Sequence, residues 1–232
     1  MDYPVLIFTA AFLVPFAVLL PIYLKAEATS SEREDGFKRA TALKVALSSY
    51  CALCGLLGFL FWGMQKDPIG ILIPVALISS VAGDYYLQFI SMEMKKFRIG
   101  ITFFALTQVL LIVFLSLHHG ISWPEFVFAA LMLFGLFLLV ARGKWNLGHA
   151  LWPLVGYTFL VALMTGKAVF PLFSGVGISP SMIVMGTGAL LFILSDILLS
   201  IKNFSGRKKT KTKNHLIVYF SAILLIALSV AF

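Results

Sequence analysis

The stretch GALLFILSDILLS, residues 188–200, is a run of apolar residues interrupted by a single acidic side chain, Asp196. A second stretch, LISSVAGDYYL at residues 77–87, contains Asp84 in a similar setting. Holding a carboxylate in the hydrocarbon core of a membrane costs about 2.5 to 3.5 kcal/mol or more. Because that cost is high, the two aspartates are the first candidates for functional residues.

The composition is that of an integral membrane protein. Hydrophobic residues make up 60% of the 232 residues and charged residues only 12%, whereas about a quarter of a soluble domain is charged. A spanning helix needs about 17 to 25 mostly apolar residues, and near-continuous apolar runs exclude an outer-membrane barrel. We therefore predict an all-α integral membrane protein with eight transmembrane helices in one bundle, a single domain over residues 1–232. The eight predicted spans are residues 3–24, 43–61, 70–90, 99–117, 126–141, 151–173, 182–201 and 216–232.

Basic residues are concentrated in alternate loops. The loops after the first, third, fifth and seventh spans contain most of the 18 Lys and Arg residues, whereas the other loops contain only Lys66. The positive-inside rule therefore predicts that both termini lie on the non-cytoplasmic side. A juxtamembrane position explains the basic run at residues 207–213, so no nucleic-acid partner is predicted. The basic residues of these loops are Lys25, Arg33, Lys38, Arg39, Lys95, Lys96, Arg98, Arg142, Lys144, Lys202, Arg207, Lys208, Lys209, Lys211 and Lys213.

The two aspartates lie in similar local patterns. Residues 83–87 and 195–199 both read small-Asp-x-x-Leu, in the third and seventh spans, which run in the same direction. Each is followed by a basic loop and then by a helix with an aromatic residue, Phe104 or Tyr219. This pattern suggests a 4+4 parallel internal repeat of the kind known among transporters, with chance similarity between apolar segments as the alternative.

Other polar side chains are predicted at a similar depth. Asp84 follows Gly70 by as many residues as Asp196 follows Met182, so both lie at nearly the same level of the membrane. The sequence therefore predicts a polar pocket that opens toward the cytoplasm. Its further members are Lys44, Gln108, Tyr157, Ser195 and Tyr219.

Each polar side chain also has a structural interpretation. Tyrosine and glutamine within a bundle often form hydrogen bonds between helices, and Lys44 is placed to act as an interfacial anchor. A structural ion pair between Lys44 and an aspartate is the alternative role for the carboxylates. We expect Lys167, toward the outer side, to extend its amine to the interface.

Two carboxyl groups in one low-dielectric pocket do not both ionise easily, so one suits the role of acid and the other that of base. That division fits hydrolysis of acetals or enol ethers, peptide hydrolysis by an aspartate dyad, and proton-coupled transport. The histidines lie in loops or at helix ends, and no set of residues has the spacing of metal ligands. Cys51 and Cys54, three residues apart within one span, are expected to be packing residues. No metal or cofactor is predicted.

The segments around these residues resemble the YhhN-like lysoplasmalogenase family of eight-span membrane proteins. The strongest similarity is in residues 188–204, which contain Asp196. Two positions depart from the family pattern: Gln108 replaces a histidine, so it cannot titrate, and Ile223 replaces a glutamine. The other similar segments are the region of Lys44, residues 80–87, residues 97–104, Tyr157 with Met164, and residues 219–222 with Leu225 and Ile226.

The resemblance implies hydrolysis of the vinyl ether bond of a lysoplasmalogen, giving a fatty aldehyde and a glycerophospho-head-group product. It implies a lysophospholipid partner, no cofactor and no obligate protein partner. We hypothesise that Asp84 or Asp196 protonates the alkenyl β-carbon, and that the other carboxylate stabilises the resulting oxocarbenium ion and activates water. In this hypothesis Lys44 holds the phosphate or tunes an aspartate.

Two other classes of protein remain open. A small proton-coupled transporter or lipid-binding protein is the main alternative, with the aspartates binding protons or cations. An intramembrane aspartyl protease is a more distant one, since Gly83-Asp84 is similar to such enzymes only locally. The membrane is predicted to be a bacterial inner membrane or the endoplasmic reticulum.

Overall fold

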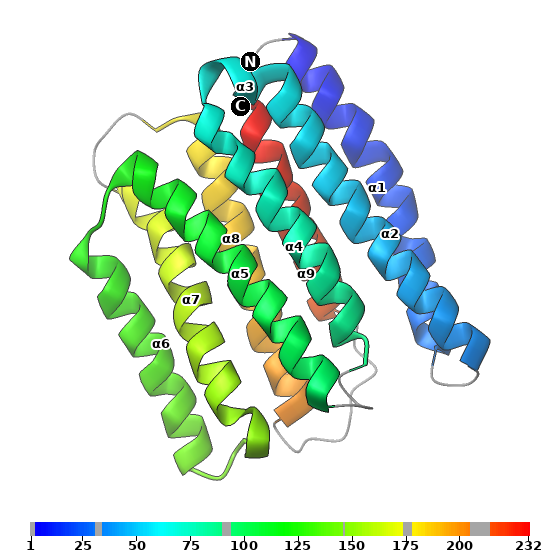
Figure 1. Ribbon diagram of the computed structural model, residues 1–232, viewed down its shortest axis with the longest axis vertical. Helices are drawn as coiled ribbons and strands as arrows, with labels where there is room; N and C mark the ends of the chain where they lie inside the picture. Colours follow the sequence, from blue (N-terminus) through cyan, green and yellow to red (C-terminus); the bar gives the residue numbers. More distant parts are fainter. Residues whose placement is uncertain (1–2, 31–33, 90–93, 146, 174–177, 205–213) are drawn as a thin grey trace.

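The computed structural model describes residues 3–30, 34–89, 94–145, 147–173, 178–204 and 214–232 (Figure 1). All regular secondary structure in these ranges is helical, and eight helices are long and apolar enough to cross a membrane. The predicted all-α fold with eight spans is therefore confirmed. The helices are α1 (Tyr3–Thr29), α2 (Glu34–Gly58), α3 (Met64–Lys66), α4 (Leu72–Leu87), α5 (Met94–His119), α6 (Trp123–Ala141), α7 (Leu151–Val169), α8 (Pro180–Phe204) and α9 (Asn214–Leu228).

Several helices extend beyond the apolar segments that predicted them. A single π-helical turn at Phe59–Gly63 joins α2 to α3, and short 3₁₀ turns begin α4 and end α7 and α9. Helix α2 begins at Glu34, well before the predicted start at Leu43, because its polar first turn places Glu34 and Asp35 at the favourable end of the helix dipole. The predicted span end at Ile90 and the basic residues Arg33, Arg207, Lys208, Lys209, Lys211 and Lys213 lie outside the described residues.

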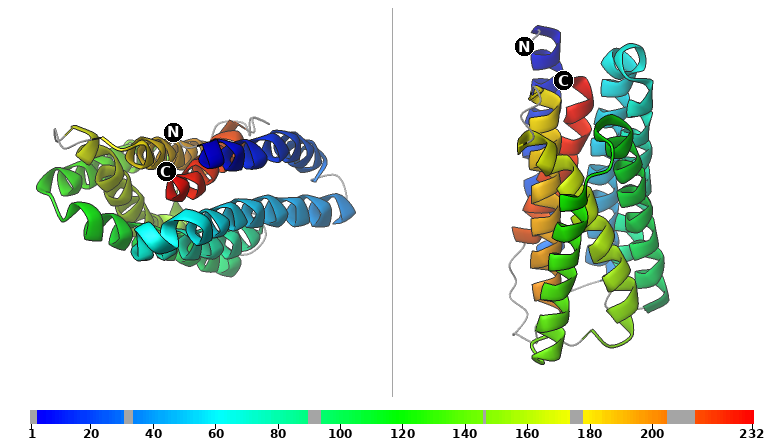
Figure 2. Two further views of the ribbon diagram at one scale, coloured as in Figure 1. Left: turned by 90° about the horizontal axis from the view of Figure 1, so that it is seen from above. Right: turned by 90° about the vertical axis from the view of Figure 1, so that its left-hand side faces the viewer.

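Six of the helices close into a ring. Going round it, α2 packs against α4, α4 against α5, α5 against α7, α7 against α8, α8 against α9, and α9 against α2. Helix α1 packs mainly on the outside of α2, and α6 mainly on the outside of α7. Figure 2 shows the resulting elongated cross-section, with α6 and α7 at one narrow end. Since α1 and α6 lie outside the ring, they expose the most apolar surface to the membrane.

Glycines allow the closest helix contacts in the ring. A Cβ at Gly188 on α8 would lie 2.9 Å from Ile226 Cγ1 on α9, and one at Gly83 on α4 would lie 2.7 Å from the ring of Phe104 on α5. Small residues at such positions let backbones approach in a membrane, where van der Waals packing drives helix association. The approach at Gly83 brings α5 beside the turn of α4 that contains Asp84.

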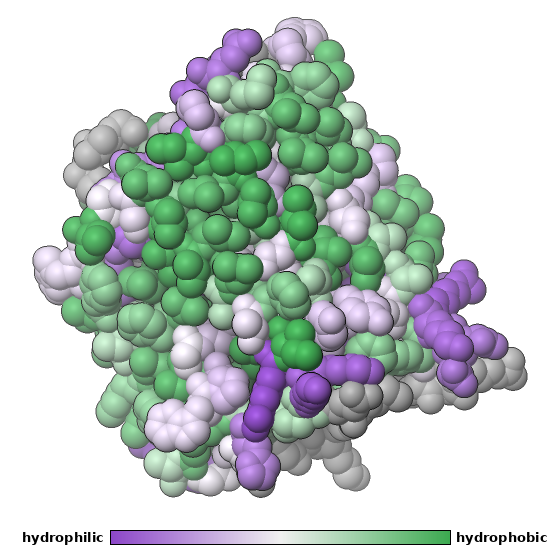
Figure 3. Space-filling view, in the orientation of Figure 1, coloured by the Kyte–Doolittle hydropathy of each residue, from purple (hydrophilic) through white to green (hydrophobic). Residues whose placement is uncertain are grey.

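The two chain ends lie at the same end of the bundle (Figure 1). Apolar side chains dominate the middle of the face seen in Figure 3, and hydrophilic side chains gather toward its upper and lower ends. This distribution is typical of a multi-pass membrane protein. Which side of the membrane the termini face stays a prediction from the basic loops.

The prediction that Lys167 extends to the interface is wrong. The side chain is 2% exposed, and its Nζ lies 2.8 Å from Glu125 Oε2 and donates to the carbonyl oxygen of Gly120 at 2.8 Å. The cause is the close approach of α6 to α7: a Cβ at Gly166 would lie only 3.2 Å from the Cα of Glu125. Lys167 therefore finds a carboxylate inside the protein and has no need to reach the interface.

We expect Lys167→Met to lower the free energy of unfolding by about 3 to 5 kcal/mol, because it leaves Glu125 buried without its counter-charge. The double variant with Glu125→Gln should recover most of the loss, since it removes both charges. Unfolding of purified protein in detergent, followed by circular dichroism, measures both effects. Equal stability of the single variant and the wild type would contradict this role for the pair.

Candidate functional site

A cavity of about 1820 Å³ lies among the helices and is lined by residues from all eight spans. Its walls include Asp84 from α4 and Asp196 from α8, so the two aspartates line the same cavity. The volume exceeds the roughly 300 to 1,000 Å³ typical of small-molecule pockets. The cavity therefore has room for a ligand as large as a single-chain lipid.

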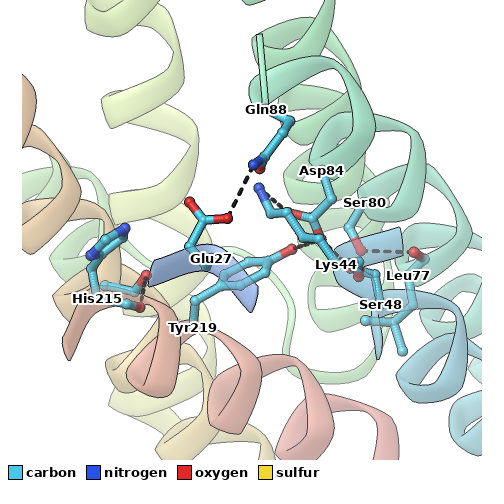
Figure 4. Close-up of polar contacts among 10 residues, drawn as sticks. Glu27, Lys44, Ser48, Leu77, Ser80, Asp84, Gln88, His215 and Tyr219 are labelled. Carbon is cyan, nitrogen blue, oxygen red and sulfur yellow. Dashed lines mark hydrogen bonds and ion pairs between the residues drawn. The ribbon is translucent and has the colours of Figure 1, made fainter. Parts of the chain in front are cut away.

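Asp84 is 1% exposed and is held by three side chains from two neighbouring helices (Figure 4). Lys44 Nζ of α2 lies 3.2 Å from Oδ1. The phenol of Tyr219 on α9 donates to Oδ2 at 2.7 Å, and the hydroxyl of Ser48 on α2 donates to the same oxygen. A lysine amine and two hydroxyl donors therefore satisfy this buried carboxyl group.

Helix periodicity explains how α2 supplies two of these contacts. Lys44 and Ser48 are four residues apart and therefore lie on one face of the helix, one turn above the other. The Ser48 hydroxyl also lies 3.1 Å from the carbonyl oxygen of Lys44. The sequence analysis missed Ser48, although its spacing from Lys44 is a signal that could have found it.

Asp196 has different surroundings. The phenol of Tyr157 on α7 donates to its Oδ2 at 2.8 Å, and the residue is half-buried. Its neighbour Ser195 donates to the carbonyl oxygen of His215 at 3.1 Å, which ties α8 to the first turn of α9. Asp196 thus meets a neutral donor where Asp84 meets a lysine.

Aromatic rings form the cavity wall next to Asp84. The ring centroids of Phe104 and Phe192 lie 6.0 and 5.8 Å from that of Tyr219, with the rings edge to face. Tyr219 and Tyr157 are also close enough to interact electrostatically. Tyr219 therefore combines a hydrogen bond to Asp84 with edge-to-face packing against two phenylalanine rings.

All but one of the predicted site residues line the cavity. Lys44, Asp84, Tyr157, Ser195, Asp196 and Tyr219 do so, whereas Gln108 is not among the described lining residues. Gln108 is fully buried in α5 and lies within interaction range of Tyr157, but neither of its amide atoms has a partner with good hydrogen-bond geometry among the described residues. Its role as a substrate contact stays a prediction.

The rim of the cavity carries charged residues that the sequence analysis assigned to loops. Arg142 and Lys144 follow α6, and Lys202 lies near the end of α8. On another part of the rim, Glu27 of α1 accepts a hydrogen bond from Gln88, the residue after α4, at 3.1 Å (Figure 4). No sequence motif connects these residues, because they belong to four helix ends that are distant in the sequence and line one cavity only in the folded chain.

The cysteines have the expected packing role. Cys51 and Cys54 are free thiols and are buried. Within the part of the chain that the structure describes, no group of three His, Cys, Asp or Glu side chains is placed to hold a metal ion. The candidate site therefore rests on carboxyl, phenol and lysine side chains.

These features define a multi-pass membrane protein with a carboxylate-lined cavity among its helices. Residues 37–230 match the model of the YhhN family, and the chain belongs to that family. The predicted resemblance is thereby confirmed at the level of the family. Comparisons with curated proteins and with solved structures find no match.

Proposed function

We propose that the protein hydrolyses the vinyl ether bond of a lysoplasmalogen, releasing a fatty aldehyde and a glycerophospho-head-group product. The observation that carries this proposal is that Asp84 and Asp196 line the same cavity in unlike surroundings. Membership of the YhhN family supports it. Two carboxyl groups whose environments separate their protonation states can divide the roles of acid and base.

The contacts favour Asp196 as the acid. Lys44 balances the negative charge of Asp84, whereas the phenol of Tyr157 supplies Asp196 with a hydrogen bond but no charge. We therefore assign the proton to the carboxyl group without a counter-charge and the role of base to the one beside lysine. The ion pair also favours the tuning role for Lys44 over the phosphate-binding role.

The reaction then proceeds in three balanced steps. The carboxyl proton of Asp196 moves to the alkenyl β-carbon, whose π electrons form the new C–H bond, and an oxocarbenium ion results. Water attacks that cation and gives its proton to Asp84, which forms a hemiacetal. The C–O bond to glycerol then breaks as Asp84 returns the proton to the leaving oxygen and Asp196 takes the hydroxyl proton, so both carboxyl groups are restored.

Two general effects would accelerate the reaction in the proposed site. General acid catalysis contributes typically about 10²- to 10⁴-fold, and a fixed negative charge near a developing cation contributes more in a site that excludes water. Asp84 provides that charge, with Ser48 and Tyr219 fixing its orientation. Tyr157 and Ser195 are proposed substrate contacts on the other side of the cavity.

We further propose that the two halves of the chain are a parallel repeat. The contact between α2 and α4 has its counterpart in that between α7 and α8, and the contact between α5 and α7 has its counterpart in that between α9 and α2. Lys44 of α2 contacts Asp84 of the next span, as Tyr157 of α7 contacts Asp196 of the next. In this proposal the two equivalent contacts have diverged, so that Asp84 is paired with a charged side chain and Asp196 with a neutral one.

The direct test incubates purified protein in detergent with a lysoplasmalogen and measures aldehyde release. We expect stoichiometric aldehyde and glycerophospho-head-group product, and no reaction with the saturated alkyl ether analogue, because a saturated chain has no β-carbon to protonate. Absence of aldehyde from folded, lipid-binding protein would overturn the proposal.

The alternative is a proton-coupled transporter or a lipid-binding protein. Buried acidic side chains facing a cavity that all eight spans line are compatible with it. Proteoliposomes with an imposed proton gradient distinguish the two functions: gradient-dependent lipid movement without product formation would favour transport.

A further inference from the structure

One arm of the cavity is apolar and runs between α6 and α8. Helix α6 packs extensively on α7, and within the described residues it makes no comparable contact with α8. Leu131 of α6 and Ile197 of α8 both line the cavity, and both are also exposed on the surface, at 62% and 37%. The cavity therefore opens toward the membrane between these two helices.

The lining residues of this arm follow helical periodicity. Residues three or four apart lie on one face of a helix, and on α6 these are hydrophobic residues together with one glycine. The opposite side of the cavity is polar, with Lys44, Asp84 and Glu27. The residues that line the arm include Met132, Gly135 and Leu139 of α6, Val161 of α7, and Ile193 and Ile197 of α8.

The arm ends at the basic part of the rim. Arg142 follows Gly135 by seven residues and Met132 by ten, so the apolar face of α6 extends about 10 to 15 Å from the rim. Lys202 follows Asp196 by six residues, about 9 Å along α8. The arm is thus an apolar channel with cations at its rim end and the carboxyl group of Asp196 between these cations and the apolar part. A single-chain phospholipid matches this arrangement, with its phosphate at the rim and its ether bond beside Asp196.

We infer that the arm between α6 and α8 holds the hydrocarbon chain of a lysophospholipid, and that Gly135 lies against the part of the chain next to the ether bond. This inference rests on the proposed function, since it assigns the chain-binding part of the same cavity. A Cβ at Gly135 would meet no atom within 4 Å, so the backbone leaves space there for a larger side chain. In this inference Gly135 touches the substrate without taking part in the chemistry.

The experiment measures binding of saturated 1-O-alkyl lysophospholipids by a scintillation proximity assay on purified protein in detergent. Gly135→Phe should lower the affinity for a hexadecyl chain at least about fivefold, because the ring and the chain compete for one space and overpacking costs about 1 to 3 kcal/mol. An octyl chain starts from the same ether bond and also passes this level, so it should lose affinity as well. Gly135→Ala should bind both chains normally.

Gly156→Phe is the matched control. Gly156 lies within α7, a Cβ there also meets no atom within 4 Å, and the residue is not among those that line the cavity. It should bind both chains normally. The inference is overturned if Gly135→Phe binds both chains as the wild type does, or if Gly156→Phe lowers the affinity as much.

Binding of alkyl ethers separates this inference from the proposed function. These lipids have no vinyl ether bond, so they report chain binding without turnover. Loss of binding in Gly135→Phe but not in Gly156→Phe would support the arm even if the protein released no aldehyde from a lysoplasmalogen.

Discussion

Asp196→Asn is expected to lower aldehyde release from lysoplasmalogen by at least about 10²-fold, the lower end of what a general acid contributes. The amide keeps the shape of the side chain and can still accept the hydrogen bond that Tyr157 donates at 2.8 Å. It cannot transfer a proton to carbon. The loss should therefore fall on catalysis, with unfolding and lipid binding close to those of the wild type.

Asp67→Asn provides the matched control for this variant. Asp67 lies 3.0 Å from His118 Nε2, next to α5, and does not line the cavity among the described residues. The same substitution there removes a charge without touching the proposed acid, so full activity is expected. Normal turnover by Asp196→Asn would leave the two-carboxylate mechanism without its proton donor.

Much of the fold could be predicted because the bilayer imposes a simple requirement. Apolar runs of sufficient length must form helices, since lipid offers no partner for the backbone, and the eight predicted spans are present. The extra turns at the start of α2 could not be read from hydropathy, because they are polar. Helix propensity and the helix dipole decide the structure there, and the residues lie beyond the apolar segment.

The candidate site could be predicted in part for a related reason. Ionisable residues in apolar runs stand out, and Asp84, Asp196, Tyr157 and Tyr219 do line one cavity. Partners across helices do not stand out, because they depend on how closely two helices approach. Gly166 decides that Lys167 meets Glu125 inside the protein, and this approach leaves no periodic signal in the sequence.

The ion pair between Lys44 and Asp84 keeps both earlier interpretations of Asp84 open, since a structural and a catalytic carboxylate would each have this partner. Their expected results differ in a pair of variants. Asp84→Asn alone leaves the amine of Lys44 buried at 8% exposure without its counter-charge. We expect it to lose activity and to lower the free energy of unfolding by about 3 to 5 kcal/mol.

Adding Lys44→Met to Asp84→Asn removes the unpaired charge and should restore most of the stability, because replacing a buried ion pair with neutral side chains is often neutral or stabilising. Activity should stay absent, since the double variant has no carboxylate to stabilise the oxocarbenium ion or to accept the proton of water. Unfolding in detergent and aldehyde release, measured on the same preparations, give the two readouts. If activity returned together with stability, Asp84 would be a structural partner of Lys44, and the chemistry would have to rest on Asp196 alone.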